Sequence, residues 1–238
     1  MASEQNTKTD NAEIWRFFQN QAADSFNGAK PRLDYLIKAV QRYAGTASPS
    51  VLNIGVGNGY FETTAKARGY QVHALDLDEE TVARLNAAGI TAACAPMEEM
   101  PYDDAMFDVV VASEVLEHLD PEQMQAGLRQ IARVLKPGGT FIGTVPYREN
   151  LEQSMVICPD CGKVFHRWGH QRSFDETTLS RELGLVFPSV NTKITGYLSF
   201  QNPSFYRVLD SIARYLLAML RMPISSTSLF FAATRSRT

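Results

Sequence analysis

Residues 51–62 read Val-Leu-Asn-Ile-Gly-Val-Gly-Asn-Gly-Tyr-Phe-Glu, and they decide how the rest of the chain is interpreted. The run begins with β-branched and apolar residues, typical of a strand buried on both faces of a parallel sheet. Gly55, Gly57 and Gly59 then make a turn whose backbone a ligand can approach closely, because glycine has no Cβ. A helix predicted over residues 60–68 directs its free N-terminal amides toward that ligand. The stretch therefore predicts a cofactor site at the end of a strand.

The glycine spacing is Gly-x-Gly-x-Gly, whereas a dinucleotide site needs its third glycine where Tyr60 stands. A tight turn that binds no ligand would have a similar sequence. Downstream residues are therefore needed to decide whether this turn binds a cofactor. A strand predicted over residues 71–78 ends in acid, and Lys136-Pro-Gly-Gly139 precedes a strand predicted over residues 140–146. Together these features resemble the class I S-adenosylmethionine-dependent methyltransferases of the type 11-like group. The resemblance covers about residues 33–146. It implies an α/β, Rossmann-like fold with a seven-stranded, mostly parallel sheet and helices on both faces.

The resemblance also implies S-adenosylmethionine as the cofactor. An acidic residue just past the second strand can accept hydrogen bonds from both ribose hydroxyls, and Asp76 has that place. In the family, the loop after the third strand borders the adenine, where Met97 matches the apolar residue and Glu98 the polar one. The cofactor-binding residues expected on this basis are Gly55, Gly57, Gly59, Asp76, Leu77, Met97, Glu98 and Ser113.

Asn53 departs from the family, because an acidic residue is usual at this end of the first strand. The charge that commonly orders the glycine turn or contacts the methionine amine is therefore missing. Either the cofactor binds more weakly, or Glu114 or the N-terminal segment supplies the missing contact. That segment, with Trp15 and Phe18 in a helix predicted over residues 14–21, resembles a lid over the cofactor. Packing of these aromatic residues on the sheet is an equal alternative.

The run Glu114-Val-Leu-Glu117-His118 directly follows the fourth predicted strand. This E-x-x-E-H pattern resembles the ubiquinone-biosynthesis O-methyltransferases and the small-RNA 3′-terminal 2′-O-methyltransferases. The resemblance implies that Glu114, Glu117 and His118 are catalytic and hold a divalent cation, which binds the acceptor hydroxyl and lowers its pKa. Methyltransferases with no known metal carry the same run. There it shapes the cofactor pocket, and His118 would serve as the general base.

A second metal motif, C-x2-C-x4-H-x3-H, is formed by Cys158, Cys161, His166 and His170. Two thiolates and two imidazoles suit tetrahedral zinc, and a glycine follows the second cysteine as a tight knuckle requires. The expected role is structural, ordering a loop that has little apolar core of its own. A redox pair and plain loop cysteines are the alternatives. His170 could instead complete a catalytic metal set with Glu117, which would leave zinc short of a ligand.

The length of 238 residues fits one domain with insertions. We expect a disordered leader over residues 1–13 and a single methyltransferase domain over residues 14–238. Cap insertions are expected at about residues 147–174, the zinc loop, and residues 202–223, an amphipathic helix. The net charge of −3 argues against general nucleic-acid binding. Three cysteines, the polar start and the lack of a bilayer-spanning run predict a cytoplasmic protein with no transmembrane segment.

The expected reaction is transfer of a methyl group to an oxygen or nitrogen of a small-molecule acceptor. Basic residues of the first cap, Lys163, Arg167 and Arg172, would suit an anionic acceptor or simply form a solvated loop. The basic amphipathic helix could cover a lipidic acceptor, touch a membrane surface or pack within the protein. A cofactor-binding but non-catalytic assembly protein, using the zinc loop and this helix as a partner surface, is the alternative function. The oligomeric state and the identity of the acceptor are not predicted.

Overall fold

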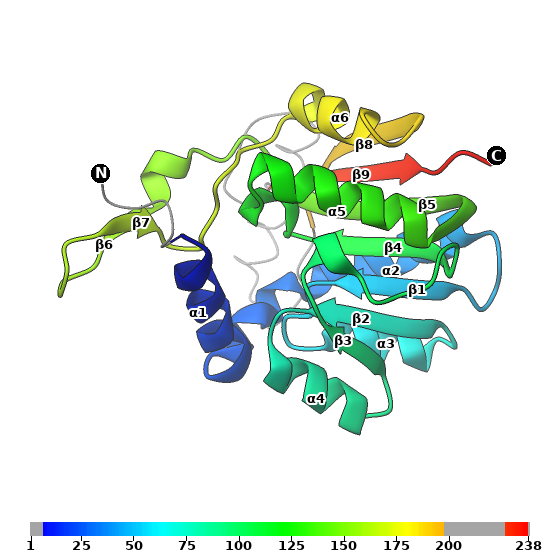
Figure 1. The fold of residues 1–238 in the computed structure, drawn as a ribbon, viewed down its shortest axis with the longest axis horizontal. Helices are drawn as coiled ribbons and strands as arrows, with labels where there is room; N and C mark the ends of the chain where they lie inside the picture. The colour runs from blue at the N-terminus through cyan, green and yellow to red at the C-terminus, as the bar shows by residue number, and fades with distance from the viewer. Residues whose placement is uncertain (1–6, 198–226, 238) are drawn as a thin grey trace, which may run out of the picture.

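The computed structural model describes residues 7–197 and 227–237, and the amphipathic helix expected over residues 202–223 lies outside them. Its centre is a seven-stranded sheet in the order β3-β2-β1-β4-β5-β9-β8 (Figure 1). The strands are β1 Ser50–Ile54, β2 Gln71–Asp76, β3 Thr91–Cys94, β4 Phe107–Ser113, β5 Leu135–Pro146, β8 Ser189–Thr195 and β9 Ser228–Thr234. Strands β1 to β5 pair in parallel, and β9 lies antiparallel between β5 and β8. The expected seven-stranded, mostly parallel sheet is confirmed.

Helices connect the parallel strands, and the helix predicted over residues 60–68 is present. The α-helices are α1 Thr7–Asn20, α2 Lys30–Ala44, α3 Tyr60–Ala67, α4 Glu79–Ala87, α5 Pro121–Val134 and α6 Glu176–Gly184. Short 3-10 helices are η2 Ala23–Ala29, η3 Met97–Glu99, η4 Leu116–His118 and η5 Leu151–Ser154. Asp78, Asp120 and Asp175 cap α4, α5 and α6, each accepting a hydrogen bond from a backbone N–H of the first turn. These caps set where the helices begin at the carboxyl side of the sheet.

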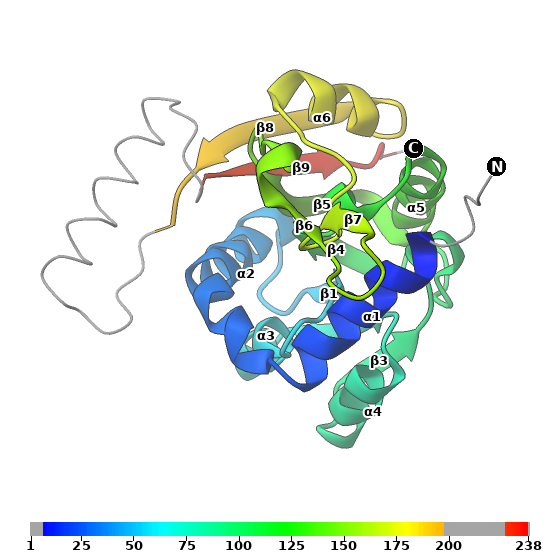
Figure 2. The same ribbon diagram turned by 90° about the vertical axis from the view of Figure 1, so that its left-hand side faces the viewer.

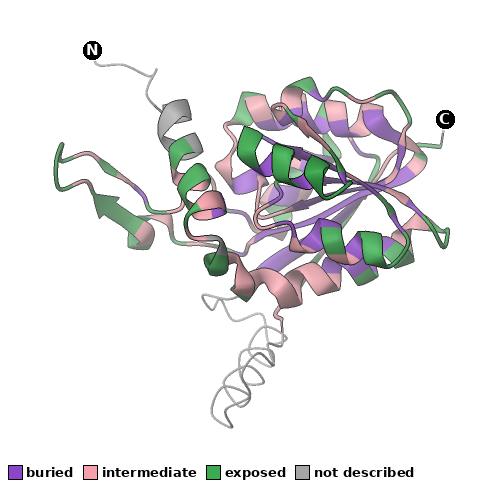
Figure 3. Ribbon diagram, turned by 90° about the horizontal axis from the view of Figure 1, so that it is seen from below, coloured by how far each residue is buried: buried purple, intermediate pink, exposed green. Residues whose placement is uncertain are grey.

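The core consists of two layers, one on each face of the sheet, as the buried strands between helices in Figure 3 show. Successive residues of a strand point to opposite faces. In β4, Val110 and Ala112 therefore pack with apolar residues of α5 and α6, while Val109 and Val111 pack with those of α2 and α3. With both faces of the central strands covered, ligands can approach the sheet only at its ends.

The expected disordered leader over residues 1–13 is wrong from Thr7 onward, because α1 begins there. Aromatic contacts explain why the helix is held in place. The Trp15 ring lies 4.9 Å from the His118 ring, and the Phe18 ring lies 5.0 Å from that of Trp168. Helix α1 thus continues the predicted helix of residues 14–21 toward the N-terminus.

Residues 147–174 form a cap beyond the carboxyl ends of the parallel strands, on the side where α1 also lies (Figures 1 and 2). The cap contains η5 and an antiparallel hairpin of β6 Met155–Ile157 and β7 Val164–His166. Among the described residues, no helix combines the length and the apolar character needed to cross a membrane. The cap and α1 together enclose the end of the sheet where the candidate site lies.

Candidate functional site

The glycine turn after β1 has the backbone geometry that its sequence requires. Gly55, Gly57 and Gly59 have φ angles of 78°, 61° and 82°, a region that favours glycine. The N–H of Val56, inside the turn, donates a 2.8 Å hydrogen bond to the carboxylate of Asp76 at the end of β2. The turn and the second strand therefore form one structural unit, as a cofactor that spans both would need.

Asp76 is 8% exposed and accepts several hydrogen bonds. Besides the Val56 N–H, its donors are the side-chain amide of Gln19 at 3.0 Å and the N–H of Asp78 at 3.0 Å. Burial raises the pKa of Asp76, although these hydrogen bonds oppose the shift. The Asp76 carboxylate therefore receives donors from the glycine turn and from α1, and its role toward the ribose stays a prediction.

Glu62 is a residue that the sequence analysis missed. It is fully buried on α3, and Asn53 donates a 2.6 Å hydrogen bond to its Oε1 and a weaker one, at 3.3 Å, to the carbonyl of Gly55. Burial raises the pKa of Glu62 to about 7. The carboxyl group absent from position 53 is thus supplied from α3, through the Asn53 amide. An acidic residue among the apolar positions of the helix after the glycine turn was the available signal.

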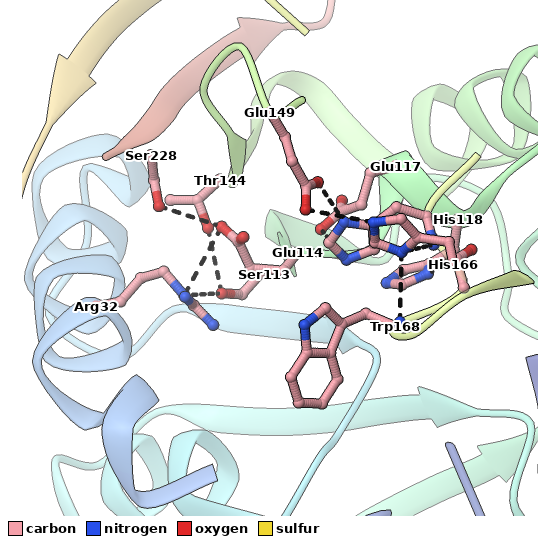
Figure 4. Close-up of polar contacts among 12 residues, drawn as sticks. Arg32, Ser113, Glu114, Glu117, His118, Thr144, Glu149, His166, Trp168 and Ser228 are labelled. Carbon is pink, nitrogen blue, oxygen red and sulfur yellow. Dashed lines mark hydrogen bonds and ion pairs between the residues drawn. The ribbon is translucent and has the colours of Figure 1, made fainter. Parts of the chain in front are cut away.

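Glu114 turns the chain at the end of β4, with a left-handed φ of 57°. Its Oε1 accepts a hydrogen bond of 3.4 Å from Ser228 and lies 3.9 Å from Nε of Arg32, which also donates to Ser113 at 3.0 Å (Figure 4). Glu117 and His118 lie in a separate group in the same view. The backbone turn therefore sends Glu114 away from the other two members of its motif, and the three do not form one ligand set.

Glu117 is fully buried, and neither oxygen of its carboxylate has a hydrogen-bond partner among the described residues. Burial, with the charge of Glu114 adding to it, raises the pKa of Glu117 well above its ordinary value. His118 Nδ1 lies 3.3 Å from the carbonyl oxygen of Gly169. Because a carbonyl only accepts, Nδ1 carries the proton and Nε2 keeps a lone pair. That Nε2 is buried and also lacks a partner within the described part of the chain.

His170 comes from the cap to complete this group. Its Nε2 lies 4.0 Å from Oε1 of Glu117, and its ring lies 4.7 Å from the ring of His118. One ligand atom from each of Glu117, His118 and His170 lies within 4.8 Å of the others. On its other side, His170 Nδ1 contacts the carboxylate of Glu149, a residue of the cap. Burial would raise the pKa of Glu149, but the hydrogen bond and charge of His170 lower it overall.

The predicted zinc set is not assembled. Cys158 and Cys161 lie in the loop of the β6–β7 hairpin, where Cys158 N–H bonds to the carbonyl of Lys163. His166 instead pairs with Met155 at the base of the hairpin. The intervening pairs separate the cysteines from His166 by roughly 10 Å along the strands. Among the described residues, neither cysteine belongs to a group of three or more ligand-type side chains. Hairpin register, which residue spacing does not reveal, separates the two cysteines from the two histidines.

Helix α1 covers both halves of the site. Trp15 packs edge-on against His118 at 4.9 Å, and Gln19, one turn later, bonds to Asp76. Phe26, which follows in η2, lies 3.1 Å from the point where a Cβ on Gly57 would stand. The N-terminal segment therefore has the position of a lid, the first of the two alternatives that the sequence left open.

Residues 52–143 match the family model described as "Methyltransferase domain". Over 105 residues the chain is 37% identical to a probable S-adenosylmethionine-dependent methyltransferase of Mycolicibacterium smegmatis, covering 43% of this chain and 40% of that protein. Over 123 residues it is 33% identical to the ubiquinone biosynthesis O-methyltransferase of Chromobacterium violaceum, covering 48% of this chain and 50% of that protein. The chain thus spans about half or less of the length of these relatives.

The solved 1,6-didemethyltoxoflavin-N1-methyltransferase of Burkholderia thailandensis contains bound 1,6-didemethyltoxoflavin and S-adenosylhomocysteine. It superposes with a TM-score of 0.69 at 17% identity, covering 99% of this chain and 92% of that one. The chain has the class I methyltransferase fold. The matched segment of this methyltransferase fold runs from β1 to β5 and contains the glycine turn, Asp76 and the E-x-x-E-H run. These findings favour a methyltransferase over a non-catalytic assembly protein.

The remaining residues expected to bind the cofactor lie around the same end of the methyltransferase sheet. Leu77 is 65% exposed just after β2. Met97 is buried in η3 and packs against Gly127 of α5, and Glu98 beside it is half-buried. Ser113, at the end of β4, bonds to Arg32 and lies 3.2 Å from the hydroxyl of Thr144. Their roles toward the cofactor stay predictions.

Proposed function

We propose that the chain transfers the methyl group of S-adenosylmethionine to a hydroxyl oxygen of a small-molecule acceptor, and that Glu117, His118 and His170 hold a divalent cation at the acceptor side. The observation that carries this proposal is the convergence of unpartnered atoms. Both oxygens of Glu117 and Nε2 of His118 are buried without hydrogen-bond partners in the described structure, and Nε2 of His170 faces the same carboxylate. Two relatives support methyl transfer to an oxygen. One is named a probable S-adenosylmethionine-dependent methyltransferase, and the other an O-methyltransferase.

The donor set fits a cation. A buried polar atom left without a partner costs about 1–3 kcal/mol, and a cation would satisfy all of these atoms together. One carboxylate and two imidazoles suit first-row dications such as Zn²⁺, Mn²⁺ or Fe²⁺. Ligand atoms that each lie about 2.0–2.2 Å from such an ion are about 3–4 Å apart. The ligand atoms here lie within 4.8 Å of one another, so small rotations would bring them to bonding positions.

A bound divalent cation lowers the pKa of a hydroxyl that coordinates it, so that the oxygen becomes nucleophilic near neutral pH. Residues of the chain bind the cofactor, exclude water and align the acceptor. Asp76 and the glycine turn hold the cofactor, and Trp15 lies against His118, where it helps exclude water. Holding the acceptor oxygen in line and about 3 Å from the methyl carbon supplies most of the remaining catalysis.

The general-base alternative for His118 is less well supported. Burial, together with His170 beside it, lowers the pKa of His118 to about 3. An imidazole that resists protonation so strongly is a weak base near pH 7, but its lone pair remains available to a metal. The Arg32 and Glu114 pair, on the other side of the turn, is the candidate contact for the charged methionine end of the cofactor.

Metal analysis combined with turnover tests this proposal. The purified full chain would be compared with the variants Glu117→Gln, Cys158→Ser and Glu152→Gln, the last being an exposed carboxylate on the same cap. S-adenosylhomocysteine release would be followed with a panel of hydroxylated acceptors. We expect metal and turnover to be lost in Glu117→Gln only, with S-adenosylhomocysteine binding retained. Loss of metal in Cys158→Ser, with Glu117→Gln unaffected, would contradict the proposed site.

A further inference from the structure

Two groups of ligand-type side chains share His170. One consists of Glu117, His118 and His170, and the other of Glu149, His166 and His170. Both groups place their ligand atoms within 4.8 Å of one another. The hydrogen bonds around the imidazoles distinguish the two groups, because each neutral ring has one donor nitrogen and one lone pair.

His166 presents its lone pair to the backbone. Its Nδ1 lies 3.1 Å from the N–H of His170 and 3.3 Å from the N–H of Trp168, and both of these groups donate. The proton of the neutral ring is therefore on Nε2. That nitrogen faces Oε1 of Glu149 at 3.5 Å, which is long for a hydrogen bond but is an attractive contact between a donor and a carboxylate. With its proton on Nε2 and its lone pair already used, His166 has no free lone pair for a metal.

His170 has the opposite arrangement. Its Nδ1 contacts the other oxygen of Glu149, Oε2. An ionised carboxylate only accepts, so Nδ1 carries the proton and Nε2 keeps the lone pair. Nε2 lies 4.0 Å from Oε1 of Glu117. The His166 and His170 rings are stacked at 4.7 Å with an angle of 20° between their planes, so both present a donor edge to Glu149.

We propose that Glu149 is a positioning residue that, supported by His166, fixes the tautomer and orientation of His170 so that Nε2 of His170 joins Glu117 and His118 as a metal ligand. The inference rests on the proposed function for the presence of the cation. On this inference, Glu149 and His166 hold His170 in position but do not bind the metal themselves. Carboxylates that accept the far N–H of a metal-binding histidine orient the ring and strengthen its lone pair as a donor.

Backbone contacts show why this support belongs to the cap. The carbonyl of Glu117 accepts hydrogen bonds from the N–H groups of Gln171 and Arg172, at 2.8 Å and 3.2 Å. The side-chain amide of Gln171 donates to the carbonyl of His118 at 2.8 Å. The segment that carries His170 is thus attached directly to η4, and the contact with Glu149 restrains rotation of the His170 imidazole ring.

Nitrogen NMR of the histidine rings tests the inference without any turnover. The full chain, labelled with ¹⁵N-histidine and freed of metal, would be recorded near neutral pH and then titrated with Zn²⁺. We expect Nδ1–H tautomers for His118 and His170 and an Nε2–H tautomer for His166. Zn²⁺ should shift Nε2 of His118 and His170 and leave the His166 nitrogens in place. An Nε2–H tautomer at His170, or Zn²⁺ bound to His166, would overturn the inference.

Variants on the cap give a second measurement. Glu149→Gln keeps an acceptor oxygen but removes the charge, and Glu149→Ala removes the acceptor, while Glu152→Gln is the matched control. We expect Zn²⁺ to bind about 10- to 100-fold more weakly when Glu149 is changed, with Ala worse than Gln and with the control unaltered. Unchanged affinity in both Glu149 variants would refute the positioning role.

Binding of S-adenosylhomocysteine, measured on the same samples, separates this inference from the proposed function. If the wild type binds S-adenosylhomocysteine and Zn²⁺ but the histidine tautomers differ from those expected, only the inference fails. If the wild type binds neither ligand, the proposed function fails with it.

Discussion

The side-chain amide of Gln19, on α1, donates a 3.0 Å hydrogen bond to the carboxylate of Asp76, at the end of β2. Asp76 is the residue expected to receive the ribose hydroxyls of the cofactor, so Gln19 occupies a position that a hydroxyl would need. We therefore expect Gln19 and the cofactor to compete for one acceptor oxygen of Asp76.

Replacing Gln19 should strengthen cofactor binding. Gln19→Ala removes the competing donor, and one hydrogen bond contributes about 0.5–1.5 kcal/mol net, so we expect S-adenosylhomocysteine to bind roughly 2- to 10-fold more tightly. Calorimetric titration measures this, with the exposed Gln21→Ala as the control. A tenfold weaker affinity in Gln19→Ala would mean that Gln19 contacts the cofactor itself.

Replacing Asp76 should have the opposite effect. Asp76→Asn keeps the shape of the side chain but loses the charge, and hydrogen bonds to a charged group contribute about 1.5–3 kcal/mol. We expect S-adenosylhomocysteine to bind about 10- to 100-fold more weakly, measured by the same titration. Asp103→Asn, an exposed site before β4, is the control. Equal affinities for the two variants would remove Asp76 from the cofactor site.

Glu62 should make stability depend on pH. Burial raises its pKa to about 7 in the folded chain, against about 4.3 in an unfolded chain. The folded state binds the proton of Glu62 more tightly than the unfolded state does. The contribution of this proton to the free energy of unfolding is complete below about pH 4.3 and is lost as pH rises through about 7. The loss amounts to roughly 4 kcal/mol. Asp76 and Arg84 are the charged groups beside Glu62 that modify this shift.

The Glu62→Gln variant tests this prediction, because glutamine does not titrate and keeps an acceptor for Asn53. Denaturant unfolding would be measured at several pH values between 4 and 8. Relative to the variant, the wild type should lose stability as pH rises through this range. The exposed Glu80→Gln variant should follow the wild type. Parallel curves for wild type and Glu62→Gln would show that Glu62 does not titrate as expected.

Gly143 should tolerate no side chain. On β5, a Cβ at this position would meet the carbonyl oxygen of Ala112 and would lie 2.6 Å from the Phe231 ring. We expect Gly143→Ala to lower the free energy of unfolding by about 1–3 kcal/mol, the usual cost of overpacking. At Gly184, the last residue of α6, a Cβ would meet nothing within 4 Å. Gly184→Ala should stabilise the chain by up to about 1 kcal/mol, so similar stabilities for both variants would contradict the packing described here.

The sequence predicts those features of the fold that depend on local patterns. The glycine turn, the buried strands and the capped helices follow from backbone freedom, periodicity and hydrogen-bonding side chains within a few residues of one another. The strand expected over residues 140–146 lies within β5 for this reason. Helix α1 begins at Thr7, before its predicted start. Its aromatic residues pack against His118 and Trp168, which are remote in sequence, so these contacts could not be predicted.

The site was predicted in part for the same reason. Asp76 ends β2, and Glu117 and His118 follow β4, so their places in the fold could be assigned from the sequence. Glu62 and Glu149 act through residues on other elements, so no spacing pattern marks them. The cysteine and histidine motif led to a zinc prediction because four ligand types at short spacing suggest one site. The hairpin register instead directs the histidines toward the sheet and the cysteines toward its own tip.

The left-handed backbone of Glu114 has a consequence for the order of events in catalysis. This turn places Glu114 in the Arg32 network, the proposed contact for the cofactor, and, three residues later, Glu117 in the proposed metal site. The two proposed substrate sites are thus joined by less than one helical turn of chain. We expect an ordered kinetic mechanism in which the cofactor binds first and aligns the acceptor ligands, visible as product inhibition by S-adenosylhomocysteine that is competitive with the cofactor alone.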